Sequence, residues 1–398
     1  MEQEQQQHQQ EQEPLIYNLP QDTLHKIFSS LPLRQIILCR SLSKFFNHLL
    51  TSPIFLHHIS ATIPPLNLLA LRHHNHHNNH HNPSTLHLFD PNLNQWLHFP
   101  LNFLPFSNPL PVASSHGLIY LWAQPNNTSP SPNSQAQAQT QTKSLLACNP
   151  LTRKFRILPQ LGSAWCRHGS VLVDSVNRVM VLTELAALYF SGGDGGDGRN
   201  GNNGGCWLKF SSNLPSKPRS PVLIEDSAYA LCCDDVGSPW RSQWKLFSCR
   251  FGSRSSVKWS RVDRREWGDV FDILKRPRLV RGVGNRILMV GGLKSSFSLN
   301  SPCSTILILR LDLGTMEWDE AGRMPVEMFR CFQDAGKFKV FGAGDRVCFS
   351  AKRIGKLALW DRGAVADGEE WRWIVNVPGN GDGVYRGFVF EGRLDALP

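Results

Sequence analysis

The chain has 398 residues, of which 41% are hydrophobic and 19% are charged, and its formal net charge at pH 7 is +10. This apolar content is enough to bury a core, which excludes a chain that is disordered throughout. No apolar run reaches the ~18–20 residues of a membrane helix, and the Gln/Glu-rich segment 1–13, a predicted disordered tail, is not a secretion signal. We therefore expect no membrane partner and a location in the nucleus, the cytoplasm or both.

The ten cysteines are irregularly spaced and include no C-x-x-C pair. This spacing predicts neither a zinc site nor a disulfide scaffold, so the thiols are expected to be reduced. No metal or other cofactor is expected.

Residues 14–60 have the apolar period of helices. Leu24, Ile27, Phe28 and Leu31 follow each other at i, i+3, i+4 and i+7, which places them on one stripe. Three short helices are predicted before Ser52–Pro53. Helices of this length are marginal alone, and a unit of ~40 residues has too small a core to cover all their apolar faces. Exposed apolar helical surface of this kind indicates a docking site for a partner.

The segment LPQDTLHKIFSSLPLRQIILCRSLSKFFNHLLTSPIF, residues 19–55, resembles the F-box. The two Leu-Pro pairs, the spaced apolar residues between them, Lys44 and the closing Ser-Pro-x-Phe carry this resemblance. It implies docking on the Skp-type linker protein of SCF (Skp–cullin–F-box) ubiquitin ligases and, through that linker, on the cullin scaffold. The residues we expect at the linker contact are Leu19, Pro20, Leu24, Ile27, Leu31 and Leu38.

Residues 61–85 are predicted to be a linker, because RHHNHHNNHHNP at 72–83 has low complexity. The histidines of this tract suggest a metal site, but no carboxylate or second set of ligands is nearby, so no metal is assigned.

Residues 86–398 change to the period of strands, with dense apolar runs such as TILILRL at 305–311. A polar turn followed by an aromatic recurs, as in DPNLNQW, CNPLTRKF and DLGTMEW. Intervals of 52–59 residues separate the aromatic anchors, which are Trp96, Phe155, Trp207, Trp259, Trp318 and Trp371. A period near ~50 residues is typical of four-stranded propeller blades of the kelch type, so six blades are predicted. Residues 125–143 and 192–205 are predicted to be disordered loops inserted in this domain.

The phrase Asn-Pro-Leu-Thr-x-x-Phe at 149–155, with the following Leu-Pro, resembles the divergent kelch domains of plant F-box/kelch-repeat proteins. The double glycine of a kelch unit occurs at Gly291–Gly292. The expected fold class is therefore mainly β, a kelch-type β-propeller preceded by a small all-α F-box unit.

The sequence contains no G-x-S-x-G, H-E-x-x-H or Walker motif, and we expect a non-catalytic adaptor. The resemblance implies a substrate-recognition subunit of an SCF ubiquitin ligase, whose propeller binds a target protein. Between Arg241 and Arg286 there are thirteen Lys or Arg and four acidic residues, a local charge of +9. An acidic or phosphorylated target segment fits such a region, and the candidate target-binding residues are Arg241, Arg254, Arg264 and Arg265.

Two alternatives remain open from the sequence. A propeller scaffold without a role in degradation would keep the same fold. A nucleic-acid-binding protein would use the basic region 241–286, although Trp259 in that region is better explained as a blade anchor.

Overall fold

The computed structural model describes residues 15–72, 85–126, 143–174, 176, 178–190, 206–233, 244–251, 258–268, 270–295, 302–333, 338–364, 370–379 and 384–398. The chain divides into two compact units. One comprises residues up to Leu66 together with 393–395, and the other comprises residues 67–392 and 396–398. Most of the predicted loop 125–143, the whole of the predicted loop 192–205 and most of the His/Asn-rich tract lie outside the described residues.

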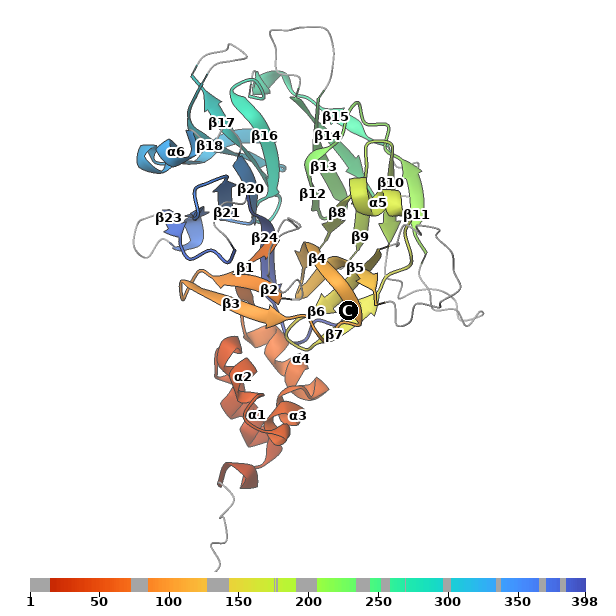
Figure 1. Ribbon diagram of the computed structural model, residues 1–398, viewed down its shortest axis with the longest axis vertical. Coiled ribbons are helices and arrows are strands. Elements are labelled where there is room, and N and C mark those ends of the chain that lie inside the picture. Colours follow the sequence, from red (N-terminus) through yellow and green to blue (C-terminus); the bar gives the residue numbers. More distant parts are fainter. Residues whose placement is uncertain are drawn as a thin grey trace, which may run out of the picture. The chain divides into compact units, whose positions relative to one another are not determined.

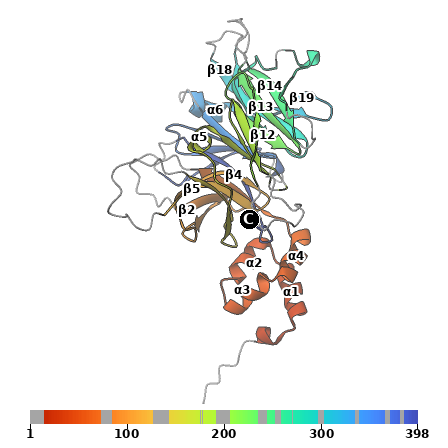
Figure 2. The same ribbon diagram turned by 90° about the vertical axis from the view of Figure 1, so that its right-hand side faces the viewer.

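The first unit is helical (Figure 2). A 3₁₀ turn, η1, spans Leu15–Asn18, and four helices follow: α1 Gln21–Ser29, α2 Leu33–Cys39, α3 Lys44–Leu50 and α4 Pro53–Thr62. Proline directly precedes α1 and α2, where its missing N–H costs nothing. The hydroxyls of Ser43 and Ser52 cap α3 and α4, accepting from the Phe46 and Phe55 backbone N–H groups at 3.2 and 3.3 Å.

The helical unit has one helix more than the three predicted. Ser52 and Pro53 begin a fourth helix instead of closing the third, because serine is a favoured N-cap and proline a favoured first residue. The buried apolar residues of the unit are Leu24, Phe28, Leu33, Ile36, Phe46, Leu49, Leu50, Phe55 and Ile59. All four helices contribute to this core.

The second unit is a β-propeller of six four-stranded antiparallel sheets, which confirms the predicted fold and blade number (Figure 1). The first blade contains β24 Arg386–Gly392, β1 Leu66–Arg72, β2 Thr85–Asp90 and β3 Gln95–Pro100. The second contains β4 Phe106–Ser115, β5 Leu118–Pro125, β6 Ser144–Asn149 and β7 Lys154–Ile157. The third contains β8 Ser170–Val173, β9 Val179–Leu182, β10 Ala186–Phe190 and β11 Leu208–Ser211.

The remaining three blades follow in chain order. The fourth contains β12 Arg219–Ile224, β13 Ser227–Cys233, β14 Trp244–Arg250 and β15 Ser260–Val262. The fifth contains β16 Leu274–Arg281, β17 Arg286–Lys294, β18 Cys303–Asp312 and β19 Glu317–Arg323. The sixth contains β20 Phe338–Ala343, β21 Arg346–Ala351, β22 Leu357–Asp361 and β23 Trp371–Ile374. Short helices α5 Ser163–His168 and α6 Val326–Gln333 and the 3₁₀ turns η2 Arg265–Trp267 and η3 Arg362–Ala364 lie in connections between strands.

Three predicted hairpin turns share one geometry. The side chains of Asp90, Asn149 and Asp312 each accept the backbone N–H two residues later, at 2.9–3.0 Å. The residues four positions later, Asn94, Arg153 and Met316, have positive φ angles of 52°, 60° and 62°. This pairing of an Asx turn with a left-handed residue turns the third strand of the blade back into the fourth. The aromatic two residues further on is then the second residue of the returning strand.

The predicted aromatic anchors separate the blades. Trp96, Trp207, Trp259, Trp318 and Trp371 each pack in a hydrophobic cluster shared by their own blade and a neighbouring one. The Trp96 indole N–H also donates to the Val375 carbonyl oxygen at 3.0 Å, across to the sixth blade. Phe155 differs, since its described ring contact is with Phe106 in the same blade. For five of the six anchors, the aromatic therefore fills the wedge that one blade cannot bury alone.

The propeller is closed by β24, which pairs with β1 inside the first blade. Residues 66–72 are thus a propeller strand, which corrects the prediction that 61–85 form a linker and that the domain begins at residue 86. Gly387 permits the close approach of these two strands, because a Cβ atom there would lie 2.0 Å from the Ala70 carbonyl oxygen. The low-complexity tract that begins at the end of β1 made the whole segment 61–85 look like a linker, so the strand was not predicted.

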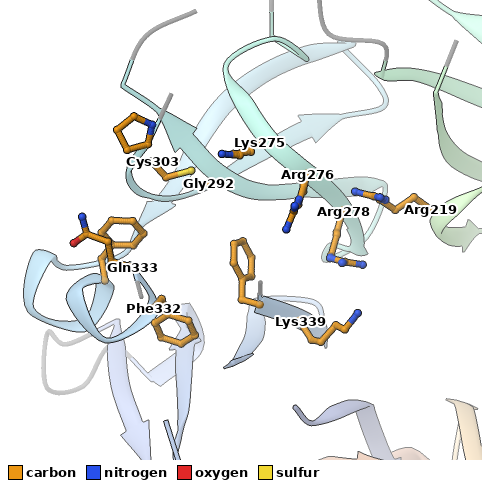
Figure 3. Close-up of a pocket in the computed structure, with 12 residues that line it drawn as sticks. Arg219, Lys275, Arg276, Arg278, Gly292, Cys303, Phe332, Gln333 and Lys339 are labelled. Carbon is orange, nitrogen blue, oxygen red and sulfur yellow. The ribbon is translucent and has the colours of Figure 1, made fainter. Parts of the chain in front are cut away.

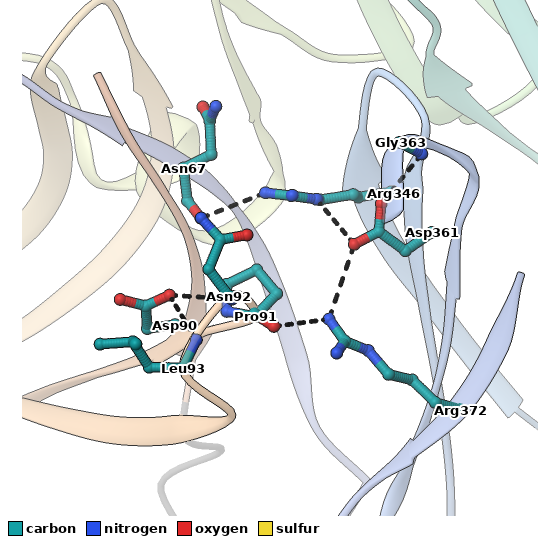
Figure 4. Close-up of polar contacts among 9 residues, drawn as sticks. All are labelled: Asn67, Asp90, Pro91, Asn92, Leu93, Arg346, Asp361, Gly363 and Arg372. Atoms are coloured by element: carbon teal, nitrogen blue, oxygen red, sulfur yellow. Dashed lines mark hydrogen bonds and ion pairs between the residues drawn. The ribbon is translucent and has the colours of Figure 1, made fainter. Parts of the chain in front are cut away.

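A buried carboxylate also joins the sixth blade to the first (Figure 4). Asp361 accepts from the Arg346 Nε at 3.0 Å and lies 3.6 Å from the Arg372 Nη2. Arg346 then donates to the Asn67 carbonyl oxygen at 3.3 Å, and Arg372 donates to the Pro91 carbonyl oxygen at 2.8 Å. One aspartate therefore orients two guanidinium groups that hold the first blade from two points.

Candidate functional site

The helical unit has a second apolar surface besides its core. Ile27 on α1 and Leu38 on α2 are 42% and 60% exposed, whereas Leu24 and Ile36 on the same helices are fully buried. Leu19, Leu42 and Phe45 are also exposed large hydrophobic residues of this unit. Exposed apolar side chains that gather on one small unit are unfavourable in water, so they indicate a surface that a partner covers.

The predicted linker-contact residues divide by burial. Leu19, Pro20, Ile27 and Leu38 are exposed, and Leu31 is partly exposed. Leu24 is corrected here: its side chain is fully buried, so it holds α1 in the unit and is not available to a partner. The i, i+3, i+4 pattern could not separate these roles, because Leu24 and Phe28 turn inward while Ile27, between them, turns outward.

Aromatic side chains fix the start of this surface. Tyr17 lies 5.2 Å from Phe45 and 5.4 Å from Phe46, measured between ring centroids, and the second pair is stacked. Phe46 also packs edge-on against Phe28 at 5.3 Å. These contacts tie the segment before α1 to α3, which fixes the backbone that leads to Leu19 and Pro20.

The propeller has a separate candidate site in its centre. A cavity of ≈ 700 Å³ is lined by residues of β4, β8, β12, β16, β20 and β24, the innermost strand of every blade. A second cavity of ≈ 510 Å³ shares Arg219, Arg278 and Lys339 with it and continues outward between the fifth and sixth blades. We call the two together the cationic cavity. Its basic residues are Arg72, Arg167, Lys217, Arg219, Lys275, Arg276, Arg278, Lys339 and Arg386.

Like charges lie close together in the cationic cavity, as Figure 3 shows for Arg219, Arg276 and Arg278. Burial, together with the charges of Arg219, Arg386 and Arg276, lowers the pKa of the Arg278 guanidinium to about 10. Burial and Arg386 also lower the pKa of Arg72, and burial and Arg276 lower that of Arg219. None of the described residues that line either part of the cavity is an aspartate or glutamate.

Of the four arginines predicted to bind a target, the structure describes two. Arg241 and Arg254 lie outside the described residues. Arg264, which directly precedes η2, and Arg265, its first residue, are exposed, and neither lines the cavity. Lys275, Arg276 and Arg278 belong to the basic region 241–286, but they are not among the predicted target-binding residues. A usable signal was the Arg-Pro and Ser-Pro pairs near the start of two inner strands, where proline marks an edge or a bulge.

Among the described residues, no helix combines the length and the apolar character needed to cross a membrane.

Comparisons with known proteins agree with the two units. Residues 16–72 match the F-box domain and residues 277–325 match the Kelch motif. The chain is 59% identical to the protein named SKP1-interacting partner 15 of Arabidopsis thaliana, over 96% of this chain and 98% of that protein. It is 33% identical to an F-box/kelch-repeat protein of the same plant, over 91% of this chain and 82% of that protein. With the helical unit and the six-bladed propeller already described, these matches show that the chain belongs to the plant F-box/kelch-repeat proteins.

Proposed function

We propose that this protein is the substrate-recognition subunit of an SCF ubiquitin ligase. The observation that carries the proposal is the exposed apolar surface of the helical unit, with Ile27 and Leu38 turned outward from helices whose other apolar residues are buried. The name of the 59% identical relative supports a Skp-type linker as the occupant of that surface. In this assignment the linker connects the chain to the cullin scaffold, and the propeller binds a target protein.

The chain itself performs no bond chemistry in this proposal. Its contribution is proximity: a target bound to the propeller has its lysines held at a high effective concentration near a ubiquitin carrier bound elsewhere in the complex. The site of action is the nucleus, the cytoplasm or both.

Co-purification with a Skp-type linker tests the docking surface. The double variant Ile27→Asp/Leu38→Asp places two charges where apolar contact is proposed, and burial of unpaired charge is strongly unfavourable. We expect it to lose linker binding by at least about 100-fold, since two buried aliphatic side chains contribute roughly 1.5–3 kcal/mol each. The matched control is Leu185→Asp, an exposed leucine of the propeller unit, which should retain binding.

Circular dichroism and thermal unfolding of the same variants show whether the helices remain folded. Equal linker binding by the double variant and the control would refute the docking surface. Capture of target proteins, compared with and without proteasome inhibition, then tests the ligase role. A captured protein whose abundance ignores both proteasome inhibition and loss of this chain would favour a scaffold without a role in degradation.

A further inference from the structure

The inner strands β4, β12 and β16 share one irregularity, and in β12 and β16 it places cations at the cationic cavity. In β16 the register shifts between Lys275 and Arg278, and Arg276 adopts a positive φ of 55° directly before a proline. In β12 the register shifts between Arg219 and Val222, with Ser220 at a φ of 45° in the same place before a proline. Bulges of this kind change the direction of side chains and are common next to functional sites.

The bulge in β16 brings three cations to one cavity. In a regular strand Lys275 and Arg276 would point to opposite faces, but Lys275, Arg276 and Arg278 all line the same space. Positive φ at a residue with a side chain is a local strain, and folded proteins retain such strain where it serves a site. The strained backbone at Arg276 is what gathers positive charge at the centre of the propeller.

The described contacts leave part of this charge uncompensated. The Arg219 Nη1 is buried without a hydrogen-bond partner, although its guanidinium stacks over Trp244 at 4.2 Å. Arg278 is surrounded by the like charges of Arg219, Arg276 and Arg386. A buried donor without an acceptor and a partly buried cation among cations are both unfavourable, and an anionic ligand would relieve both.

The outward part of the cavity has a different chemistry. Phe329, Phe332 and Phe338 line it together with Pro302, and they lie in the same space as Lys275 and Arg276. Figure 3 shows Phe332 and Gln333 of α6 on one side of this space and the basic residues on the other. Phe329 and Phe332 are largely buried in the core of the fifth and sixth blades and present only part of their rings to this space, whereas Phe338 is half-buried. A small polyanion would use the cations and leave this apolar wall uncovered. A peptide that carries acidic groups next to an aromatic or aliphatic side chain would use both.

We propose that the cationic cavity binds a segment of the target protein that combines several anionic side chains with an adjoining apolar one. Carboxylates of Asp or Glu and phosphate groups of modified Ser or Thr share this chemistry, since both form charge-assisted and bidentate hydrogen bonds with arginine. The anionic groups contact Arg219, Arg276 and Arg278. The apolar side chain packs against Phe338 and the accessible parts of the Phe329 and Phe332 rings. This inference rests on the proposed function, because it names the class of target that the ligase subunit would recognise.

Fluorescence polarisation on the full chain with synthetic peptides tests the proposal. The first probe contains four consecutive glutamates followed by Phe-Leu, and the second has phosphoserine in place of two glutamates. Two controls replace all glutamates by glutamine or Phe-Leu by Ser-Ser. We expect binding of at least one anionic probe, loss with the glutamine peptide, and binding about tenfold weaker with the Ser-Ser peptide. The ratio between the glutamate and phosphoserine probes identifies the source of the anion.

Charge-matched variants locate the site. The triple variant Arg219→Gln/Arg276→Gln/Arg278→Gln should weaken binding roughly tenfold or more per cation removed. The control Lys258→Gln/Arg264→Gln/Arg265→Gln removes the same charge from exposed positions outside the cavity and should bind as the natural chain does. Phe338→Ser, at the half-buried phenylalanine of the apolar wall, should reproduce the effect of the Ser-Ser peptide.

Several results would overturn the proposal. The first is no binding of either anionic peptide, and the second is equal loss in both triple variants. A third is binding that is unaffected by Phe338→Ser and by the Ser-Ser change. If neither apolar change affects binding and inositol hexakisphosphate displaces the probe at a lower concentration than any peptide does, the ligand is a small polyanion instead. Preferential binding of a single-stranded RNA probe would likewise reject a peptide ligand. Linker co-purification, which uses the other unit, should be normal in the cavity variants, so a failure here is distinguishable from a failure of the ligase assignment.

Discussion

Replacing Asp361 by alanine should loosen the closure of the propeller. The Asp361 side chain is 3% exposed and pairs with Arg346 at 3.0 Å and Arg372 at 3.6 Å, and its other oxygen accepts the Gly363 N–H at 3.2 Å. Removing one partner of a buried ion pair typically costs about 3–5 kcal/mol. Since the two arginine side chains are 19% and 33% exposed, water compensates part of the loss, and we expect about 3 kcal/mol.

Thermal unfolding measures this effect. An unfolding entropy of about 2.1 cal/mol/K per residue, over a propeller unit of roughly 330 residues, converts about 3 kcal/mol into a Tm decrease of about 4–5 °C. The matched control is Asp319→Ala, which breaks the Arg310–Asp319 pair, where the aspartate side chain is 50% exposed. Pairs at the surface contribute about 0–1 kcal/mol, so the control should lower Tm by less than about 2 °C.

The conservative variant Asp361→Asn separates charge from hydrogen bonding. Its amide oxygen can still accept the Gly363 N–H, but it cannot neutralise two guanidinium groups, so its Tm should lie between those of Asp361→Ala and the natural chain. If Asp361→Ala melts within about 1 °C of Asp319→Ala, Asp361 does not hold the sixth blade to the first, and the reasoning is refuted.

Three further results are expected. Leu24→Ala should destabilise the helical unit by about 2–5 kcal/mol by leaving a cavity, and an unchanged helical melting signal would contradict its place in the core. Arg278→Gln should stabilise the propeller by about 1 kcal/mol in thermal unfolding. The folded-state pKa of Arg278 is lowered to about 10, so its charge opposes folding at neutral pH. The natural chain should therefore gain stability as pH rises from about 10 toward 12.5. A lower Tm of Arg278→Gln than of the natural chain would contradict this. Burial raises the pKa of the Cys148 and Cys249 thiols to about 12, whereas Cys206 is exposed. Iodoacetamide at pH 8 should therefore label Cys206 in the native chain and label Cys148 and Cys249 only after unfolding, which mass spectrometry of the labelled peptides measures.

The sequence was most informative where one short pattern has one structural solution. The Asx residue, the left-handed residue and the aromatic lie within seven positions, so their geometry is local and Asp90, Asn149 and Asp312 could be read directly. The repeat of the aromatic then predicted the blade number. The end strands were harder, because β1 and β24 belong to one blade although more than 300 residues separate them.

The cationic cavity could not be predicted for a related reason. Its residues come from the inner strands of all six blades, and only the closed propeller brings Arg219, Arg278 and Arg386 together. In the sequence these arginines are spread over more than 150 positions and look like ordinary surface charge. The helical unit gave a mixed outcome, since periodicity identified the amphipathic helices but not which apolar residues face inward.

The pairing of β24 with β1 gives this protein a sensitive point late in its synthesis. While the ribosome is still producing the fifth and sixth blades, β1 has already been made but lacks its inner neighbour β24. The first blade, and with it the closed propeller, can therefore form only after translation passes residue 392. A premature stop codon before Arg386 would remove β24 and leave an unpaired β-sheet edge on β1. Cellular quality control would then encounter an aggregation-prone polypeptide in place of a working receptor.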